Sequence, residues 1–258
     1  MAPVAYRSLV KNLIALLFAI SFSIGIAAEP ETPTKFFLIG NSLTWDTVPP
    51  NLDGDTQWHV DCGKPLPYIF ANPDEPCVKT STLWPKALAE KQYDVIALQV
   101  HYGSTLGEDA ATISEIITKQ PDAVIVIHTG WARHAERAEE WEIKSGAVDA
   151  PMQHHIAYFD ALLATLREAH PDRSFSRTRA MDMLQQVVED VKTGKEPIAS
   201  VDELYRDKVH MNVATGRYLM HNAMRHALGQ PRSANGFAKL EPEMKKYLDS
   251  VLDRVLGE

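Results

Sequence analysis

Clusters of basic residues, internal repeats and low-complexity segments are all missing from this chain of 258 residues. Its 34 acidic residues outnumber its 26 lysines and arginines, which gives a formal net charge of −8 at pH 7. Nucleic acids and anionic membranes attract proteins through clustered positive charge. We therefore expect neither a nucleic acid nor an anionic membrane surface to be a partner.

Long hydrophobic runs are missing beyond the N-terminus. The one such run, residues 13–28, follows two basic residues and ends in small residues. This pattern is typical of a secretory signal peptide, although an uncleaved membrane anchor is the alternative. The run is short for a full membrane span. We expect residues 1–27 to be a signal peptide, residues 28–258 to form a single domain, and the protein to be secreted or periplasmic.

Cysteine is scarce, since Cys62 and Cys77 are the only two. An exported protein meets oxidising conditions, so we expect a Cys62–Cys77 disulfide, with two buried thiols as the alternative. The pair has no further Cys or His at the spacing of a zinc site. The zinc-protease motif His-Glu-x-x-His is absent, and the closely spaced histidines do not share a helix face. We expect neither a metal nor another cofactor.

A short apolar run that ends at a glycine is the first positive signal. Phe36–Ile39 predicts a buried strand, Gly40 allows a sharp bend, and Ser42 follows directly. Ligands of open α/β sheets bind at the carboxyl ends of the strands, so Ser42 is a candidate nucleophile. Serine is also a preferred N-cap of helices, and that alternative stays open on the local sequence.

Strands and amphipathic helices alternate along the rest of the chain. Further strands are predicted over residues 57–61, 93–100, 122–128 and 175–180. Helices are predicted over residues 82–91, 111–120, 151–170, 184–191, 212–229 and 244–255. This alternation predicts an α/β fold with a parallel sheet covered on both faces. The charged segment 132–150 lacks a core pattern and is interpreted as an insertion over or beside the site.

A second group of reactive side chains lies near the C-terminus. Asp207 and His210 are three residues apart in a short polar turn. An aspartate in this position can fix the tautomer of the histidine, whose other nitrogen then takes the proton of a serine hydroxyl. Serine is a weak nucleophile until such a base lies beside it. Ser42, His210 and Asp207 are therefore the expected catalytic residues.

Two motifs together resemble the SGNH (GDSL-type) hydrolase superfamily. They are Gly-Asn-Ser-Leu at residues 40–43 and Asp-x-x-His at residues 207–210. Asn41 stands where the better-known form of the first motif has an aspartate. The resemblance implies a serine esterase on a flavodoxin-like, three-layer α/β/α fold with a central parallel sheet, working without a cofactor.

The same resemblance implies an oxyanion hole. Its backbone donors would be the N–H groups of Ser42 and Gly63, although an ordinary turn glycine is the alternative reading of Gly63. The family's third donor is the asparagine of a Gly-x-Asn-Asp motif, and no Asn-Asp follows the strand at residues 93–100. The amide of Gln99 is the nearest replacement and His101 is the other option. We expect Gln99, because an amide donates independently of pH.

The resemblance implies an exported esterase for short acyl esters, such as acetyl esters on carbohydrates, and the export signal, acidity and aromatic residues suit such substrates. The expected substrate-binding residues are Trp45, His101, Tyr102 and Trp131, with a packed surface tryptophan as the alternative for Trp131. A non-catalytic carbohydrate-binding module of the same fold is the alternative function. Such a module has no chemical need for serine, histidine and aspartate together, which favours catalysis.

Overall fold

The computed structural model describes residues 33–144 and 149–257. The predicted signal peptide, residues 1–27, lies outside the described residues. Within the described part, five parallel strands form one sheet in the order β2-β1-β3-β4-β5. These are β1 (Lys35–Gly40), β2 (Asp55–Val60), β3 (Val95–Gln99), β4 (Val124–His128) and β5 (Phe175–Arg177). The predicted α/β fold with a parallel sheet is confirmed.

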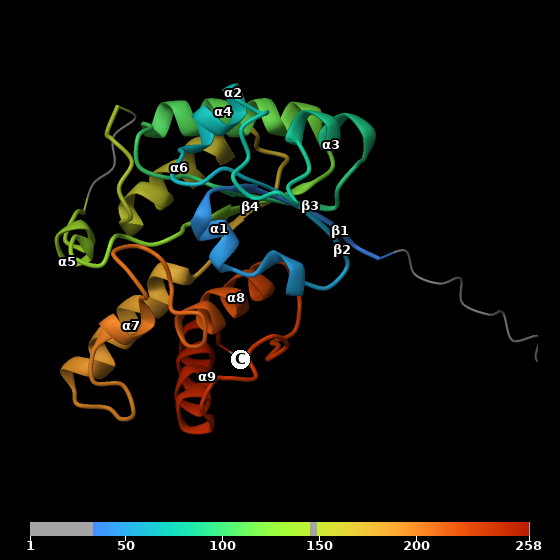
Figure 1. The fold of residues 1–258 in the computed structure, drawn as a ribbon. Helices are drawn as coiled ribbons and strands as arrows, with labels where there is room; N and C mark the ends of the chain where they lie inside the picture. Colours follow the sequence, from blue (N-terminus) through green and yellow to red (C-terminus); the bar gives the residue numbers. More distant parts are fainter. Residues whose placement is uncertain (1–32, 145–148, 258) are drawn as a thin grey trace, which may run out of the picture. The chain divides into compact units, whose positions relative to one another are not determined.

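Helices cover both faces of this sheet (Figure 1). One face carries α2 (Leu66–Ala71), α3 (Trp84–Glu90), α4 (Leu106–Lys119) and α6 (Ile156–Ala169). The other carries α8 (Gly216–Ala227), with α7 (Ala180–Lys192) and α9 (Pro242–Leu256) packed beside it. Two short helices, α1 (Ser42–Asp46) and α5 (Arg137–Trp141), lie in the connections. The three-layer arrangement matches the flavodoxin-like expectation, including its strand order.

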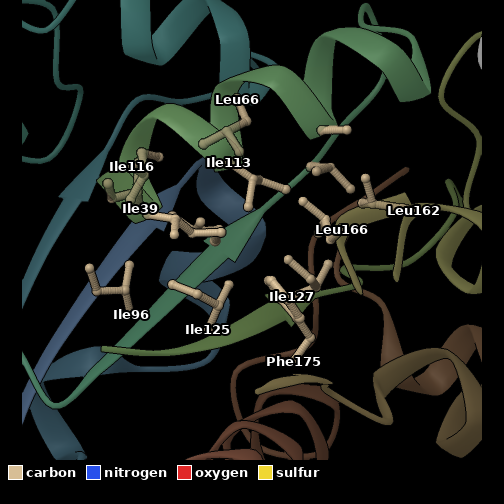
Figure 2. Close-up of a cluster of buried hydrophobic side chains, with 14 of the residues drawn as sticks. Ile39, Leu66, Ile96, Ile113, Ile116, Ile125, Ile127, Leu162, Leu166 and Phe175 are labelled. Atoms are coloured by element: carbon tan, nitrogen blue, oxygen red, sulfur yellow. The ribbon is translucent and has the colours of Figure 1, made fainter. Parts of the chain in front are cut away.

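Alternate residues of the strands enter two different cores, as a sheet buried on both faces requires. In β1, Phe37 and Ile39 face α2, α4 and α6, whereas Phe36 and Leu38 face α8. Figure 2 shows the first of these cores, with labelled side chains Ile39, Leu66, Ile96, Ile113, Ile116, Ile125, Ile127, Leu162, Leu166 and Phe175. Burial on both faces explains why the strands are continuous apolar runs in the sequence.

Helices α4 and α6 start furthest from their predicted positions. Helix α4 begins five residues earlier, because Thr105 and Glu108 form a reciprocal capping box. Helix α6 begins five residues later, because Pro151 pairs with Thr105 in an isolated bridge and His155 provides the cap. The predicted start of α6 at a proline was wrong, since a capping side chain sets it instead.

A disulfide joins Cys62 to Cys77. The backbone N–H of Cys77 also donates to the carbonyl of Val60, over 3.0 Å, so the bridge returns the chain to the end of β2. A bridge with a sequence separation of 15 stabilises a fold by about 3 kcal/mol in the chain-entropy model. It also restrains the turn at Gly63, the residue next to Cys62. No helix among residues 33–144 and 149–257 is long and apolar enough to cross a bilayer.

Asp109 on α4 is a fully buried carboxyl group, and its burial raises its pKa to about 7. The hydroxyls of Tyr158 and Ser104 donate to Oδ2 over 2.7 and 3.0 Å and oppose that rise, while Oδ1 has no partner. A raised pKa means that the folded state holds a proton that the unfolded chain releases near pH 4. The free energy of unfolding therefore falls as the pH rises from about 4 to about 7.

Asp109→Asn is expected to raise the free energy of unfolding at pH 8 by on the order of 2 kcal/mol, because the amide cannot ionise. At pH 4 the same variant should differ little from wild type. Urea unfolding at both pH values measures the difference. Asp122→Asn, at an exposed position between α4 and β4, is the control and should show no pH-dependent gain. Equal gains for Asp109→Asn at both pH values would contradict this prediction.

Candidate active site

Ser42, His210 and Asp207 form one hydrogen-bonded row beyond the carboxyl end of β1. Ser42 Oγ lies 3.0 Å from His210 Nε2. His210 Nδ1 lies 3.0 and 2.9 Å from Asp207 Oδ1 and Oδ2. A carboxylate on Nδ1 places the ring proton there and leaves the lone pair of Nε2 to accept from the Ser42 hydroxyl. This arrangement has the geometry of a Ser-His-Asp triad.

Asn41, and not Ser42, caps α1. Its Oδ1 accepts from the backbone N–H of Leu43 over 2.9 Å. Ser42 is the first residue of the helix and is partly exposed. The alternative left open by the local sequence, a capping serine, is therefore excluded, and the Ser42 hydroxyl is available to His210.

Asp207 stays ionised over nearly the whole accessible pH range. Burial raises its pKa, but hydrogen bonds from the N–H groups of His210 and Val209 and from the His210 ring outweigh burial and lower the pKa to about 2. The two backbone donors lie 2.8 and 2.9 Å from Asp207 Oδ1. They fix the carboxylate in position before any substrate arrives.

Gln99, at the end of β3, lies buried beneath the turn that carries Ser42. Its Oε1 accepts from the backbone N–H groups of Asn41 and Thr44 over 3.1 and 2.9 Å, and from the Thr44 hydroxyl over 2.7 Å. Its Nε2 donates to Asn41 Oδ1 over 2.8 Å. Because this carboxamide is only 1% exposed and holds the turn from below, Gln99 supports Ser42. This is a correction to its expected role as an oxyanion donor.

Gln99→Leu is expected to lower the free energy of unfolding by about 3 kcal/mol, because two buried backbone N–H groups lose their acceptor. It should also slow labelling of Ser42 by a fluorophosphonate, since the turn loses its support. Gln120→Leu is a matched control, because Gln120 is equally buried and accepts from the backbone of Tyr93. That variant should lose stability and keep the labelling rate. Wild-type stability in Gln99→Leu, measured by urea unfolding, would contradict the supporting role.

Gly63 lies in a turn attached to the loop of Ser42. Asn41 Nδ2 donates to the carbonyl of Lys64 over 3.1 Å, and the N–H of Asp61 donates to the carbonyl of Gly40 over 3.0 Å. Gly63 has a φ of 71°, a conformation that favours glycine, and a Cβ there would meet open space. The exposed backbone of Gly63 is therefore held beside the Ser42 loop.

His101, the other expected donor, has its tautomer set by a second histidine. His154 Nδ1 lies 2.8 Å from the carbonyl of Thr129, which can only accept, so Nδ1 carries the proton. Burial lowers the pKa of His154 well below its ordinary value, so its Nε2 accepts from His101 Nδ1, 3.4 Å away. Burial also lowers the pKa of His101 to about 4. At neutral pH, His101 Nε2 therefore carries a lone pair and cannot donate to an oxyanion.

The other expected substrate-binding residues differ in exposure. Trp45 is partly exposed, and its ring lies 5.9 Å from that of Trp58. Tyr102 is also partly exposed, with the guanidinium of Arg133 4.7 Å from its ring. Trp131 is completely buried, and its indole N–H donates to the carbonyl of Val209 over 2.6 Å. The expected contact of Trp131 with substrate is therefore wrong.

The sequence interpretation missed Asp46, a completely buried carboxylate on α1. Its partners are Arg206, Arg217 and the backbone of Met211. The only sequence signal is one acidic residue, a helical turn after Ser42, in an otherwise uncharged helix. In the part of the chain that the structure describes, no cluster of three or more His, Cys, Asp or Glu side chains can hold a metal ion.

The sequence matches no protein-family model and no curated protein. Similar solved structures include a protein assigned as a GDSL-like lipase from Parabacteroides merdae, with a TM-score of 0.47 and 14% identity over 77% of this chain and 96% of that one. A salicylyl-acyltransferase of a tetracycline biosynthetic pathway has a TM-score of 0.45 and 13% identity over 78% of this chain. A family two carbohydrate esterase from Clostridium thermocellum has a TM-score of 0.44 and 11% identity over 78% of this chain.

The match spans 55% of the acyltransferase and 66% of the carbohydrate esterase. At identities of 11–14%, these likenesses transfer neither an activity nor a substrate to this chain. The solved structures to which this chain is similar thus include a GDSL-like protein, an acyltransferase and a carbohydrate esterase.

Proposed function

We propose that this protein is an exported serine esterase that hydrolyses short acyl esters through an acyl-enzyme. The observation that carries the proposal is the row of hydrogen bonds from Ser42 Oγ through His210 to Asp207. A serine hydroxyl 3.0 Å from an imidazole nitrogen, with a carboxylate on the other nitrogen, is the arrangement that activates serine for acyl transfer.

In the proposed reaction, Ser42 Oγ attacks the ester carbonyl while His210 Nε2 takes the hydroxyl proton. The N–H groups of Ser42 and Gly63 would hold the negative oxygen of the tetrahedral intermediate. His210 then gives its proton to the leaving alcohol, and the acyl group stays on Ser42. A water molecule, deprotonated by His210, attacks the acyl-enzyme, releases the acid and restores the Ser42 hydroxyl. Asp207 stabilises the imidazolium in both halves.

The openness of the site supports an ester carried on a larger molecule. The side chains of His210 and Asp207 are 28% and 47% exposed, so the reacting groups lie near the surface rather than in a deep channel. Trp45 and Tyr102 add partly exposed aromatic rings, which combine apolar faces with a polar edge. Short acyl groups on carbohydrates, acetyl groups foremost, fit these features better than long-chain lipids.

A fluorophosphonate probe tests the proposal directly, because it reacts with activated serines. The labelled protein is digested, the modified residue is identified by mass spectrometry, and hydrolysis of p-nitrophenyl acetate is followed in parallel. We expect modification at Ser42 with a matching loss of hydrolysis. Labelling at another residue, or hydrolysis that survives complete labelling of Ser42, would overturn the proposal.

One observation favours a second function, a non-catalytic carbohydrate-binding module. Neither Gln99 nor neutral His101 supplies a third oxyanion donor, and loss of one donor typically lowers kcat by about 10²–10³-fold. A binding module would show no labelling and no hydrolysis, yet would bind glycans. The same probe experiment, followed by glycan-binding assays, separates the two functions.

A further inference from the structure

We propose that Asp46 is the positioning residue that holds His210 against Ser42, an inference that rests on the esterase function proposed above. Asp46 lies on α1, one helical turn after Ser42, and is completely buried. Its Oδ2 accepts from the backbone N–H of Met211, the residue after His210, over 2.7 Å. The carboxylate therefore connects α1, which begins with Ser42, to the hairpin of residues 205–211, which carries His210.

Two arginines complete the environment of this carboxylate. Arg206 Nη1 lies 3.1 Å from Asp46 Oδ1, and Arg217 Nε and Nη2 lie 2.8 and 2.7 Å from the same oxygen. Arg206 Nη1 also donates to the carbonyl of Met211 over 2.7 Å. Asp46 and Arg206 thus bind the N–H and the carbonyl of the same residue, which fixes the peptide backbone on both sides of Met211.

The hairpin itself is short and closed. The N–H of Arg206 donates to the carbonyl of His210 over 2.9 Å, and Tyr205 pairs with Met211 in an isolated bridge. A shift of Met211 therefore moves His210 with it. Among the described residues, Asp46 makes the only side-chain bonds between α1 and this hairpin apart from the Ser42–His210 contact itself. The separation of Ser42 Oγ and His210 Nε2 consequently depends on Asp46.

A purely structural ion pair is the competing explanation, because breaking any buried ion pair destabilises a protein. The two explanations differ in what happens to turnover in the folded protein. Asp46→Asn keeps the size of the side chain but turns one acceptor oxygen into a donor. Either Met211 or an arginine then loses its acceptor, and the hairpin shifts. A misplacement of about 1 Å at catalytic groups can cost about 10²-fold in rate.

The experiment compares Asp46→Asn with wild type, well below the unfolding temperature of each. We expect kcat for p-nitrophenyl acetate to fall about 100-fold with KM little changed, and labelling of Ser42 by the fluorophosphonate to slow in parallel. Asp190→Asn is the matched control. Asp190 is 5% exposed and pairs with Arg254 and the Tyr247 hydroxyl between α7 and α9, away from Ser42. That variant should lose stability and keep wild-type kcat.

A wild-type kcat in folded Asp46→Asn, with a stability loss like that of Asp190→Asn, would overturn the positioning role. If Asp46→Asn does not fold, Arg217→Lys replaces it, since lysine keeps the charge but cannot make both bonds to Asp46 Oδ1. We expect about a tenfold lower kcat for Arg217→Lys, and an unchanged kcat would again overturn the role. Full activity in Ser42→Ala would instead overturn the proposed function, so the two failures are distinguishable.

Discussion

Ser42→Ala is expected to lower kcat for p-nitrophenyl acetate by on the order of 10⁶-fold, the loss typical of removing the nucleophile from a Ser-His-Asp triad. The variant lacks the oxygen that lies 3.0 Å from His210 Nε2, so no acyl-enzyme can form. Because Asn41 caps α1, the fold should not depend on the Ser42 hydroxyl. Steady-state hydrolysis and urea unfolding, measured on the same preparation, test both statements.

A matched control is available in Ser114→Ala. Ser114 Oγ also lies within hydrogen-bonding distance of a histidine, 2.8 Å from His170 Nε2, but among the described residues no carboxylate bonds the other nitrogen of that ring. We expect this variant to keep wild-type kcat and Ser114 to remain unlabelled by a fluorophosphonate. Equal activity in Ser42→Ala and wild type would remove Ser42 from the reaction and leave the esterase proposal without its nucleophile.

Asp207→Asn is expected to lower kcat by on the order of 10⁴-fold while leaving the fold intact. An asparagine oxygen can still accept from the backbone N–H groups of Val209 and His210, so the turn should persist. Its amide can instead donate to the His210 ring and favour the tautomer in which Nε2 carries the proton. A protonated Nε2 cannot take the proton of Ser42.

The pH dependence gives an independent check on Asp207. Since its pKa is lowered to about 2, wild-type activity should show no loss from protonation of Asp207 above about pH 3. Asp202→Asn is the control for Asp207→Asn, because the Asp202 carboxylate also contacts a histidine ring, that of His134, at the surface. That variant should keep wild-type kcat over the whole pH range. An equal loss of kcat in Asp207→Asn and Asp202→Asn would contradict a specific role of Asp207 in the reaction.

The sheet could be predicted because its strands are buried on both faces, and this burial leaves continuous apolar runs such as Phe36–Ile39. The helix starts could not be predicted as well, because they depend on which side chain caps them. At α4, a threonine and a glutamate form a reciprocal capping box at the start of the helix. At α6, the side chain of a histidine caps the helix, and the proline lies before it. Hydrophobic periodicity does not show which of several neighbouring side chains will cap a helix.

The site was predictable only where residue type and motif agree. Ser42, Asp207 and His210 are chemically distinctive, and the structure brings their side chains together. Gln99 was misassigned because a sequence does not show whether an amide faces the substrate or the backbone of a neighbouring turn. Asp46 was missed for the same reason, since its partners lie about 160 residues away and meet it only in the folded chain.

The separation of Ser42 and His210 along the chain also bears on when the proposed active site can assemble. Ser42 follows a central strand made early in synthesis, whereas His210 is 168 residues further on and reaches Ser42 only when the C-terminal hairpin docks. Bringing together two residues so far apart in the chain costs loop-closure entropy before the contact can stabilise the fold. Under the proposed function, a partly folded chain that has assembled its sheet without this hairpin would be inert toward esters, so hydrolysis would report docking of the hairpin rather than formation of the sheet.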